Sequence, residues 1–127
     1  MYNKRHRKKE REDIDKMAEI VYINEEEALK RLGGNKVLYS KLLKRFVDDL
    51  PNHDVSKYIA DGDIKNAQAE AHTVKGMAAN LSLIAAYEEA TKLDSMLKNN
   101  TVDPNILQEY EKIIAETVSE VNKYLGL

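Results

Sequence analysis

The chain has 127 residues, a length typical of a single domain, with a net charge of −2 and no cysteine. The lack of cysteine excludes disulfide scaffolds, zinc sites with thiolate ligands and cysteine nucleophiles. No run of about 18 apolar residues is present and the first residues are charged, so neither membrane insertion nor a secretory signal is expected. We expect a reducing, cytoplasmic location.

The charge is distributed unevenly along the chain. Residues 1–16 hold seven Lys and Arg against four Asp and Glu, a net charge of +3, so the remaining residues carry −5. A nucleic-acid-binding domain normally has a broad basic face, which an acidic body does not provide. We therefore expect no nucleic-acid partner. Residues 1–16 are predicted to be a charged tail or linker, and residues 17–127 the folded domain.

The first half of that domain is predicted to be helical, because its apolar residues recur at spacings of three and four. A first helix is expected at about 10–22. Asn24, followed by three glutamates, predicts the start of a short helix that ends at Gly33-Gly34. Asn35 begins a longer helix that Pro51 ends or kinks, with a helical continuation to Asp61-Gly62.

The second half contains three further helices. Asp63 begins one that reaches about Asn80, a second covers about 83–98, and the Asp103-Pro104 pair begins a third that runs to about 124. Long amphipathic helices joined by short connections favour antiparallel packing of neighbours. The sequence predicts an all-α fold, an antiparallel up-down four-helix bundle with a short N-terminal helical extension.

The helix from Asp63 to Leu81 contains a histidine just outside its apolar stripe. The stripe has spacings of 3, 4, 3, 4 and 3 and consists of Ile64, Ala67, Ala71, Val74, Ala78 and Leu81. His72 lies one position beyond Ala71, about 100° round the helix. The imidazole is therefore predicted at the edge of the core, with access to solvent.

Gly76 is unusual because it lies in the middle of this helix, one turn after His72. The other four glycines fall at predicted turns or at the C-terminus, whereas a glycine inside a helix costs about 1 kcal/mol relative to alanine. Together with Ala79, Gly76 would leave a shallow notch beside the imidazole. Close approach of another protein would explain the missing side chain, and so would a neighbouring helix of the same fold that fills the space.

Residue chemistry alone makes His72 a candidate nucleophile. A neutral imidazole can attack with one ring nitrogen near neutral pH, while a hydrogen bond to the other nitrogen fixes the tautomer. Lys75 lies on the same helix face and can offset the charge of a phosphoryl group. An exposed histidine beside a lysine is also common on protein surfaces without any function, and these two residues alone do not decide between the possibilities.

The segment Ala71-His72-Thr73-Val74-Lys75-Gly76 and the small residues after it resemble the signature of histidine phosphotransfer (HPt) domains. The resemblance extends over about residues 22–100, including the Gly33-Gly34 break and the Asp61-Gly62-Asp63 turn. Four positions depart from the family pattern. Val74 stands where leucine is usual, and Asp94 is shorter than the usual glutamate. Met77 stands where a small residue is common, and Ser82 stands where glycine usually ends the helix.

The resemblance implies a role for each site residue. His72 would be the phosphoacceptor, Lys75 would stabilise the phosphoryl group and Asp94, on the next helix, would orient His72. The partner would dock over a set of residues in the same helix, namely Gln68, Gly76, Met77 and Ala79.

The resemblance also implies the function and the partners. The chain would be a phosphorelay intermediate that accepts a phosphoryl group on His72 from a receiver-domain aspartate or a kinase and passes it to another receiver. The partners would be a response-regulator receiver domain and a sensor or hybrid histidine kinase. The chain would have no ATP site, kinase activity or cofactor of its own, and would be a monomer.

Other sites are not supported by the sequence. A di-iron bundle needs Glu-x-x-His pairs, but Ala69 stands three residues before His72 and Leu50 three before His53. We predict no metal site, and we expect His53 to be a solvent-facing residue at the helix kink. Gly33-Gly34 lacks the lysine and hydroxyl residue of a phosphate-binding loop. The alternative function is a non-catalytic helical module that binds a partner helix in the notch.

Overall fold

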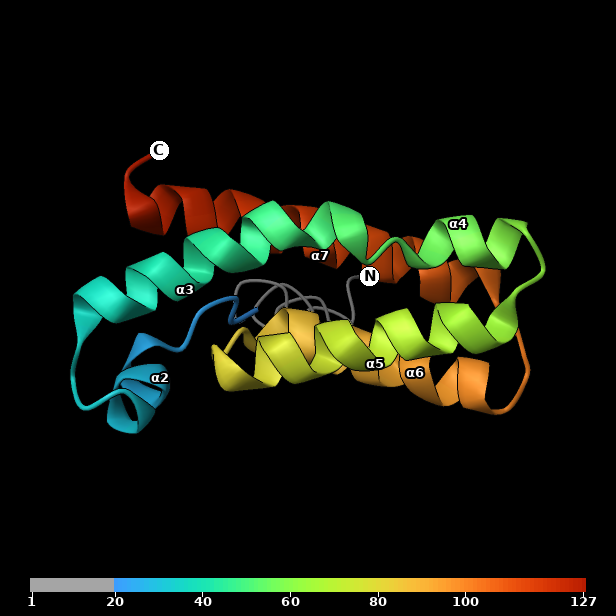
Figure 1. Cartoon of the computed structure of the whole chain (residues 1–127), viewed down its shortest axis with the longest axis horizontal. Helices are drawn as coiled ribbons and strands as arrows, with labels where there is room; N and C mark the ends of the chain where they lie inside the picture. The colour runs from blue at the N-terminus through green and yellow to red at the C-terminus, as the bar shows by residue number, and fades with distance from the viewer. Residues whose placement is uncertain (1–19) are drawn as a thin grey trace, which may run out of the picture.

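A computed structural model of the chain describes residues 20–127, and no strand occurs in that range (Figure 1). The predicted tail at residues 1–16, and most of the helix expected at about 10–22, lie outside the described residues. The prediction is wrong for residues 20–22, the only part of that helix that the structure describes. Residues 20 and 21 have no regular structure, and Tyr22 lies in a bend. The Val21 carbonyl accepts a hydrogen bond from the Ala85 amide, which ties this segment to a later helix.

The other helices begin and end close to the predicted positions. Their bounds are α2 Glu25–Arg31, α3 Lys36–Asp49, the 3-10 turn η1 Leu50–Asn52, α4 Val55–Ala60, α5 Ile64–Asn80, α6 Ile84–Lys98 and α7 Pro104–Leu125. The predicted caps are confirmed, because a side-chain oxygen accepts a hydrogen bond from a first-turn amide at Asn24, Asn35, Asp63 and Asp103. Asp54 begins α4 in the same way.

The long helices pack side by side around one interior. In Figure 1, α5 lies against α6, while α3 and α4 follow one another along α7. Contacts also join α6 to α7 and α4 to α5. The interior holds two groups of buried residues, one around Tyr39, Leu43 and Leu83 and one around Val74 and Leu93. Both groups include residues of α5 and α6, so this helix pair is anchored along its whole length.

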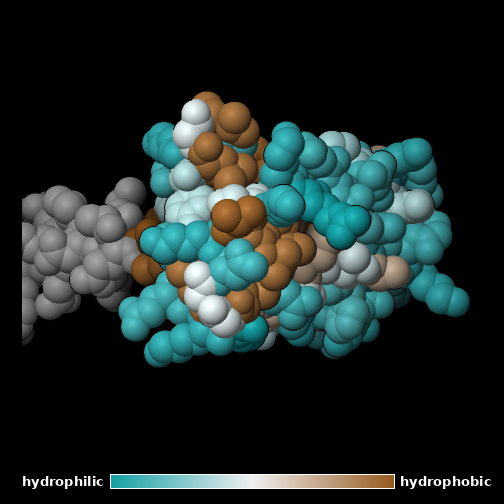
Figure 2. Space-filling view, turned by 60° about the vertical axis from the view of Figure 1, so that its left-hand side comes forward, coloured by the Kyte–Doolittle hydropathy of each residue, from teal (hydrophilic) through white to brown (hydrophobic). Residues whose placement is uncertain are grey.

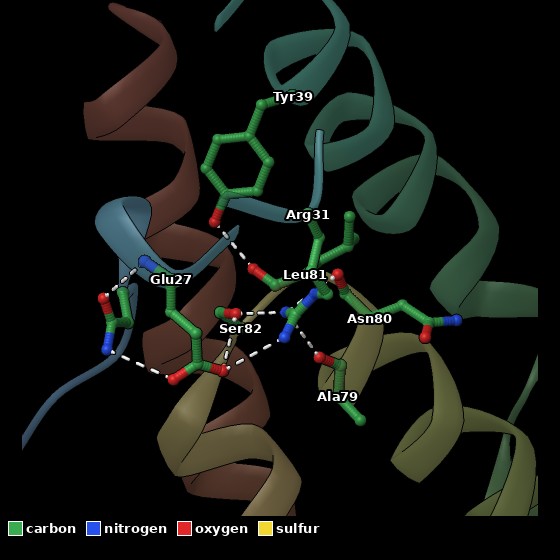
Figure 3. Close-up of polar contacts among 8 residues, drawn as sticks. Glu27, Arg31, Tyr39, Ala79, Asn80, Leu81 and Ser82 are labelled. Atoms are coloured by element: carbon green, nitrogen blue, oxygen red, sulfur yellow. Dashed lines mark hydrogen bonds and ion pairs between the residues drawn. The ribbon is translucent and has the colours of Figure 1, made fainter. Parts of the chain in front are cut away.

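Helix α2 is fixed to the end of α5 by polar contacts (Figure 3). The Arg31 guanidinium donates to the carbonyl oxygens of Ala79 and Asn80, at 3.0 and 3.2 Å. A cation at a helix C-terminus satisfies the last carbonyls and opposes the negative end of the helix dipole. Glu27 accepts a hydrogen bond from the Ser82 hydroxyl at 3.0 Å. These contacts fix where α5 ends and α6 begins.

Ser82, which stands where the family that the sequence resembles usually has glycine, adopts a left-handed backbone conformation with φ of 54°. This conformation costs little for glycine and more for a residue with a Cβ atom. Ser82 is almost fully buried, and its carbonyl oxygen accepts a hydrogen bond from the Asn24 amide at 2.9 Å. The hydrogen bonds of its side chain and backbone help to hold a turn that would otherwise favour glycine.

Hydrophobic side chains gather at the end of the molecule where α3 begins and α7 ends (Figure 2). Val37, Leu38 and Leu127 are 67%, 38% and 77% exposed there. Most of the remaining surface in that view is hydrophilic. Every helix within residues 20–127 is too short or too polar to span a membrane.

The expectation that His53 faces solvent is wrong. Its side chain is only 20% exposed, because it lies between Asp49 at the end of α3 and Glu70 in α5. The His53 Nε2 atom is 3.1 Å from Asp49 Oδ2, and Nδ1 pairs with the Glu70 carboxylate. Burial alone would lower the pKa of His53, but the hydrogen bonds and negative charges of Glu70 and Asp49 more than offset this and raise the pKa.

The stability of the fold should therefore depend on pH through His53. Because the pKa is raised in the folded state, the contribution is fully present below the unfolded value of about 6.5 and is lost as pH rises through the folded value. We expect His53→Gln to destabilise the fold on the order of 1 kcal/mol at about pH 6 and by less at about pH 9. Urea unfolding of both proteins at both pH values measures this, and an equal difference at the two pH values would contradict it.

Candidate functional site

The structure confirms where helical phase placed His72. In α5, Ala67, Ala71, Val74 and Ala78 are fully buried, whereas the His72 side chain is 63% exposed. The buried stripe fixes the rotation of α5 about its axis, because turning the helix would expose these residues to water. The imidazole therefore lies at the edge of the α5–α6 interface.

Asp94 of α6 is the buried partner of the imidazole. Its side chain is 1% exposed, and its Oδ2 atom lies 3.3 Å from His72 Nδ1. The other oxygen, Oδ1, accepts a hydrogen bond from Gln68 Nε2 at 2.7 Å. The carboxylate thus joins two residues of α5, one turn apart, that the sequence predicted in different roles.

The Asp94 carboxylate is ionised at neutral pH. Burial alone would raise its pKa, but the hydrogen bonds from Gln68 and His72 and the charge of Lys98 more than offset burial and lower the pKa. An ionised carboxylate is only an acceptor, so the Nδ1 atom of His72 must carry the proton in this hydrogen bond. The neutral imidazole then has its lone pair on Nε2, the nitrogen that Asp94 does not engage.

Two lysines lie close to the Asp94 carboxylate. Lys75, which the sequence singled out, is 27% exposed and its Nζ atom is 3.7 Å from Asp94 Oδ2. Lys98, which the sequence analysis missed, is 56% exposed and lies 3.5 Å from the same oxygen. The spacing of four residues between Asp94 and Lys98 on one helix could have identified this pair.

Gly76 faces open space. Among residues 20–127, a Cβ atom built on it would meet no atom within 4 Å other than its chain neighbours and the nearby backbone of its own helix, and the residue is exposed. The possibility that a neighbouring helix fills the missing side chain is therefore wrong. Glycine destabilises the helix at this position, and no packing contact within the described fold compensates for that loss.

The other two residues predicted for docking differ in exposure. Ala79 is exposed, whereas Met77 is half-buried and packs against both groups of core residues. Met77 also lines a groove of about 420 Å³ between α2, α3 and α5, together with Leu42, Phe46 and Leu81. Met77 thus contributes to the core as well as to the surface near Gly76.

Among residues 20–127, no group of three or more His, Asp or Glu side chains is arranged to hold a metal ion. In the site itself, His72 is paired with one carboxylate and two lysines lie close by. Cations next to a carboxylate disfavour a divalent metal and favour an anionic ligand. The arrangement places a ring nitrogen of His72 and the positive charges of two lysines close together at the protein surface.

Comparison with known proteins identifies the family. The model of the Hpt domain matches residues 41–121, which is more than half of the chain and includes every site residue described above. No curated protein and no solved structure matches the chain. The family match agrees with the resemblance carried by the segment around His72 and Gly76, and with the helical fold. The chain therefore belongs to the Hpt domain family, whose members transfer phosphoryl groups on histidine in two-component phosphorelays.

Proposed function

We propose that the chain is a phosphorelay intermediate that carries a phosphoryl group on His72. The donor would be a receiver-domain aspartyl phosphate or a histidine kinase, and the acceptor would be a second receiver domain. The observation that carries the proposal is the His72–Asp94 pair, in which a buried carboxylate engages Nδ1 of a 63% exposed imidazole. The membership in the Hpt family supports the same function.

The transfer step uses the nitrogen that Asp94 leaves free. The Nε2 lone pair attacks phosphorus, the new N–P bond forms, and the P–O bond of the aspartyl phosphate breaks to release the aspartate carboxylate. The ring keeps its proton on Nδ1 and gains positive charge, which the Asp94 carboxylate offsets at 3.3 Å. The reverse step returns the phosphoryl group to another aspartate.

Lys75 and Gly76 have separate roles in this proposal. The Lys75 ammonium, on the same helix face as His72, offsets the negative charge of the phosphoryl oxygens. Gly76 leaves room for the receiver, since nothing within the described fold occupies the space beside it. Ala79 and Met77 continue the docking surface, and the groove beside Met77 offers apolar contacts to the same partner. Gln68 lies at the rim of this docking surface and also donates a hydrogen bond to Asp94.

We also propose the arrangement of the helices and the bounds of the domain. The packing of α3 along α7, of α4 along α5 and of α5 against α6 supports an antiparallel up-down four-helix bundle. Residues 17–127 would form this domain, and residues 1–16, a charged tail or linker, would lie outside it. A monomeric state, a cytoplasmic location and the absence of an ATP site, of kinase activity and of any cofactor of its own stay predictions from the sequence.

Labelling with a phosphorylated receiver domain tests the proposed function. We expect wild type to take up phosphate in a form that is labile to acid and stable to base, as expected for phosphohistidine, and His72→Gln to take up none. The matched control is His53→Gln, which replaces a half-buried histidine away from the site. It should label like wild type.

The alternative is a non-catalytic helical module in which His72 never carries phosphate. The exposed notch beside Gly76 fits this function as well, because a partner helix could occupy it. An unlabelled wild-type protein would favour this alternative. Full labelling of His72→Gln would exclude His72 as the acceptor.

Substitution of Gly76 separates stability from transfer. Because the position is exposed and helical, Gly76→Ala and Gly76→Gln should each stabilise the fold, by about 0.5–1 kcal/mol. Gly76→Gln should slow transfer from a receiver by at least about tenfold, since a long side chain hinders the close approach that in-line attack requires. Urea unfolding and the rate of label uptake measure the two effects.

Lys112→Gln is the control for this pair, because Lys112 is exposed on α7, a helix that contributes no residue to the site. It should leave the transfer rate unchanged. If Gly76→Gln transfers as fast as wild type, Gly76 has no role in receiver approach.

A further inference from the structure

One carboxylate in the site is shared by two lysines from different helices. Asp94 Oδ2 lies 3.7 Å from the Lys75 ammonium on α5 and 3.5 Å from the Lys98 ammonium on α6. The family resemblance gave a role to Lys75 and none to Lys98. This carboxylate already engages His72 and Gln68, so the second cation beside it requires an explanation.

Burial makes a cation beside Asp94 necessary. The carboxylate is 1% exposed, and a buried charge without a partner is strongly destabilising. A phosphoryl group on His72 would bring about 1.5–2 further negative charges close to it. In the proposed transfer, Lys75 pairs with the phosphoryl oxygens. Asp94 would then lose one of its two cations at the moment when negative charge nearby increases.

Lys98 can remain with Asp94 throughout this step. It lies four residues after Asp94 on the same helix, a spacing at which an acidic residue and a following lysine attract each other. It also occupies the last turn of α6, where a positive charge is favoured by the helix dipole. Its position therefore depends on α6 alone and not on the α5 face that receives the phosphoryl group.

We propose that Lys98 is a positioning residue: it is the permanent counter-ion of Asp94, and it leaves Lys75 free to pair with the phosphoryl group. This inference rests on the proposed function and assigns different tasks to the two lysines. Lys98 acts through Asp94 rather than by contact with the phosphoryl oxygens. Without Lys98, the carboxylate would hold Lys75 and would also repel the incoming anion.

The test uses the full chain and phosphoramidate, a small phosphoryl donor that needs no partner protein. In the reaction, Nε2 of His72 forms the N–P bond and the P–N bond of phosphoramidate breaks to release ammonia. We expect Lys98→Met to label roughly two- to fivefold more slowly than wild type, the range for a half-exposed ion pair. Lys98→Arg keeps the charge and should restore the rate.

Lys92→Met is the matched control. Lys92 also lies on α6, is 62% exposed and pairs with a glutamate three residues earlier, Glu89, but it is not among the lysines that pair with Asp94. Its variant should label like wild type. An Asp94 carboxyl titration, followed by ¹³C NMR, adds a readout without phosphate: Lys98→Met should raise the pKa of Asp94, and Lys92→Met should not.

A double variant decides whether Lys98 acts through Asp94. In an Asp94→Asn background, Lys98→Met should slow labelling no further, because the carboxylate on which Lys98 acts is gone. The same two- to fivefold loss in that background would overturn the proposal and favour direct contact with phosphate. An unchanged rate for Lys98→Met in an otherwise wild-type chain would also overturn it. Failure of wild type to label on His72 would instead contradict the proposed function itself.

Discussion

The buried carboxylate of Asp94 is the constraint on which the site depends. A carboxylate that is 1% exposed must be paired, and its partners come from two helices: Gln68, His72 and Lys75 from α5 and Lys98 from α6. Of these partners, Gln68, His72 and Lys98 lower its pKa despite burial, and an ionised Asp94 in turn fixes the proton of His72 on Nδ1. The packing of α5 against α6 therefore determines the chemistry of an exposed side chain.

The helical stripe and the caps made most of the fold predictable. Helix bounds follow from capping residues such as Asp63 and Asp103, which act on the adjacent turn and so can be recognised locally. Contacts between distant residues could not be recognised in this way. His53 was expected in solvent, but Glu70, 17 residues later, pairs with it. The left-handed Ser82 is similarly held by Asn24 and Glu27, more than 50 residues earlier.

The site itself was predictable to different degrees. The exposure of His72 followed from helical phase, and the open space at Gly76 now excludes internal packing as its cause. Asp94 was named through the family resemblance alone, because no spacing on one helix relates it to His72. Lys98 was missed, although its spacing of four from Asp94 was visible. Its importance depends on knowing that Asp94 is buried, which only the packing of α5 on α6 reveals.

The position of the phosphoryl group on the imidazole ring reports whether Asp94 sets the reactive nitrogen of His72. Phosphorus–nitrogen couplings in a chain with ¹⁵N-labelled histidine distinguish the two ring nitrogens after phosphorylation. We expect phosphate on Nε2 of His72 with the proton retained on Nδ1, because Asp94 engages Nδ1 at 3.3 Å. Phosphate on Nδ1, or on a residue other than His72, would contradict it.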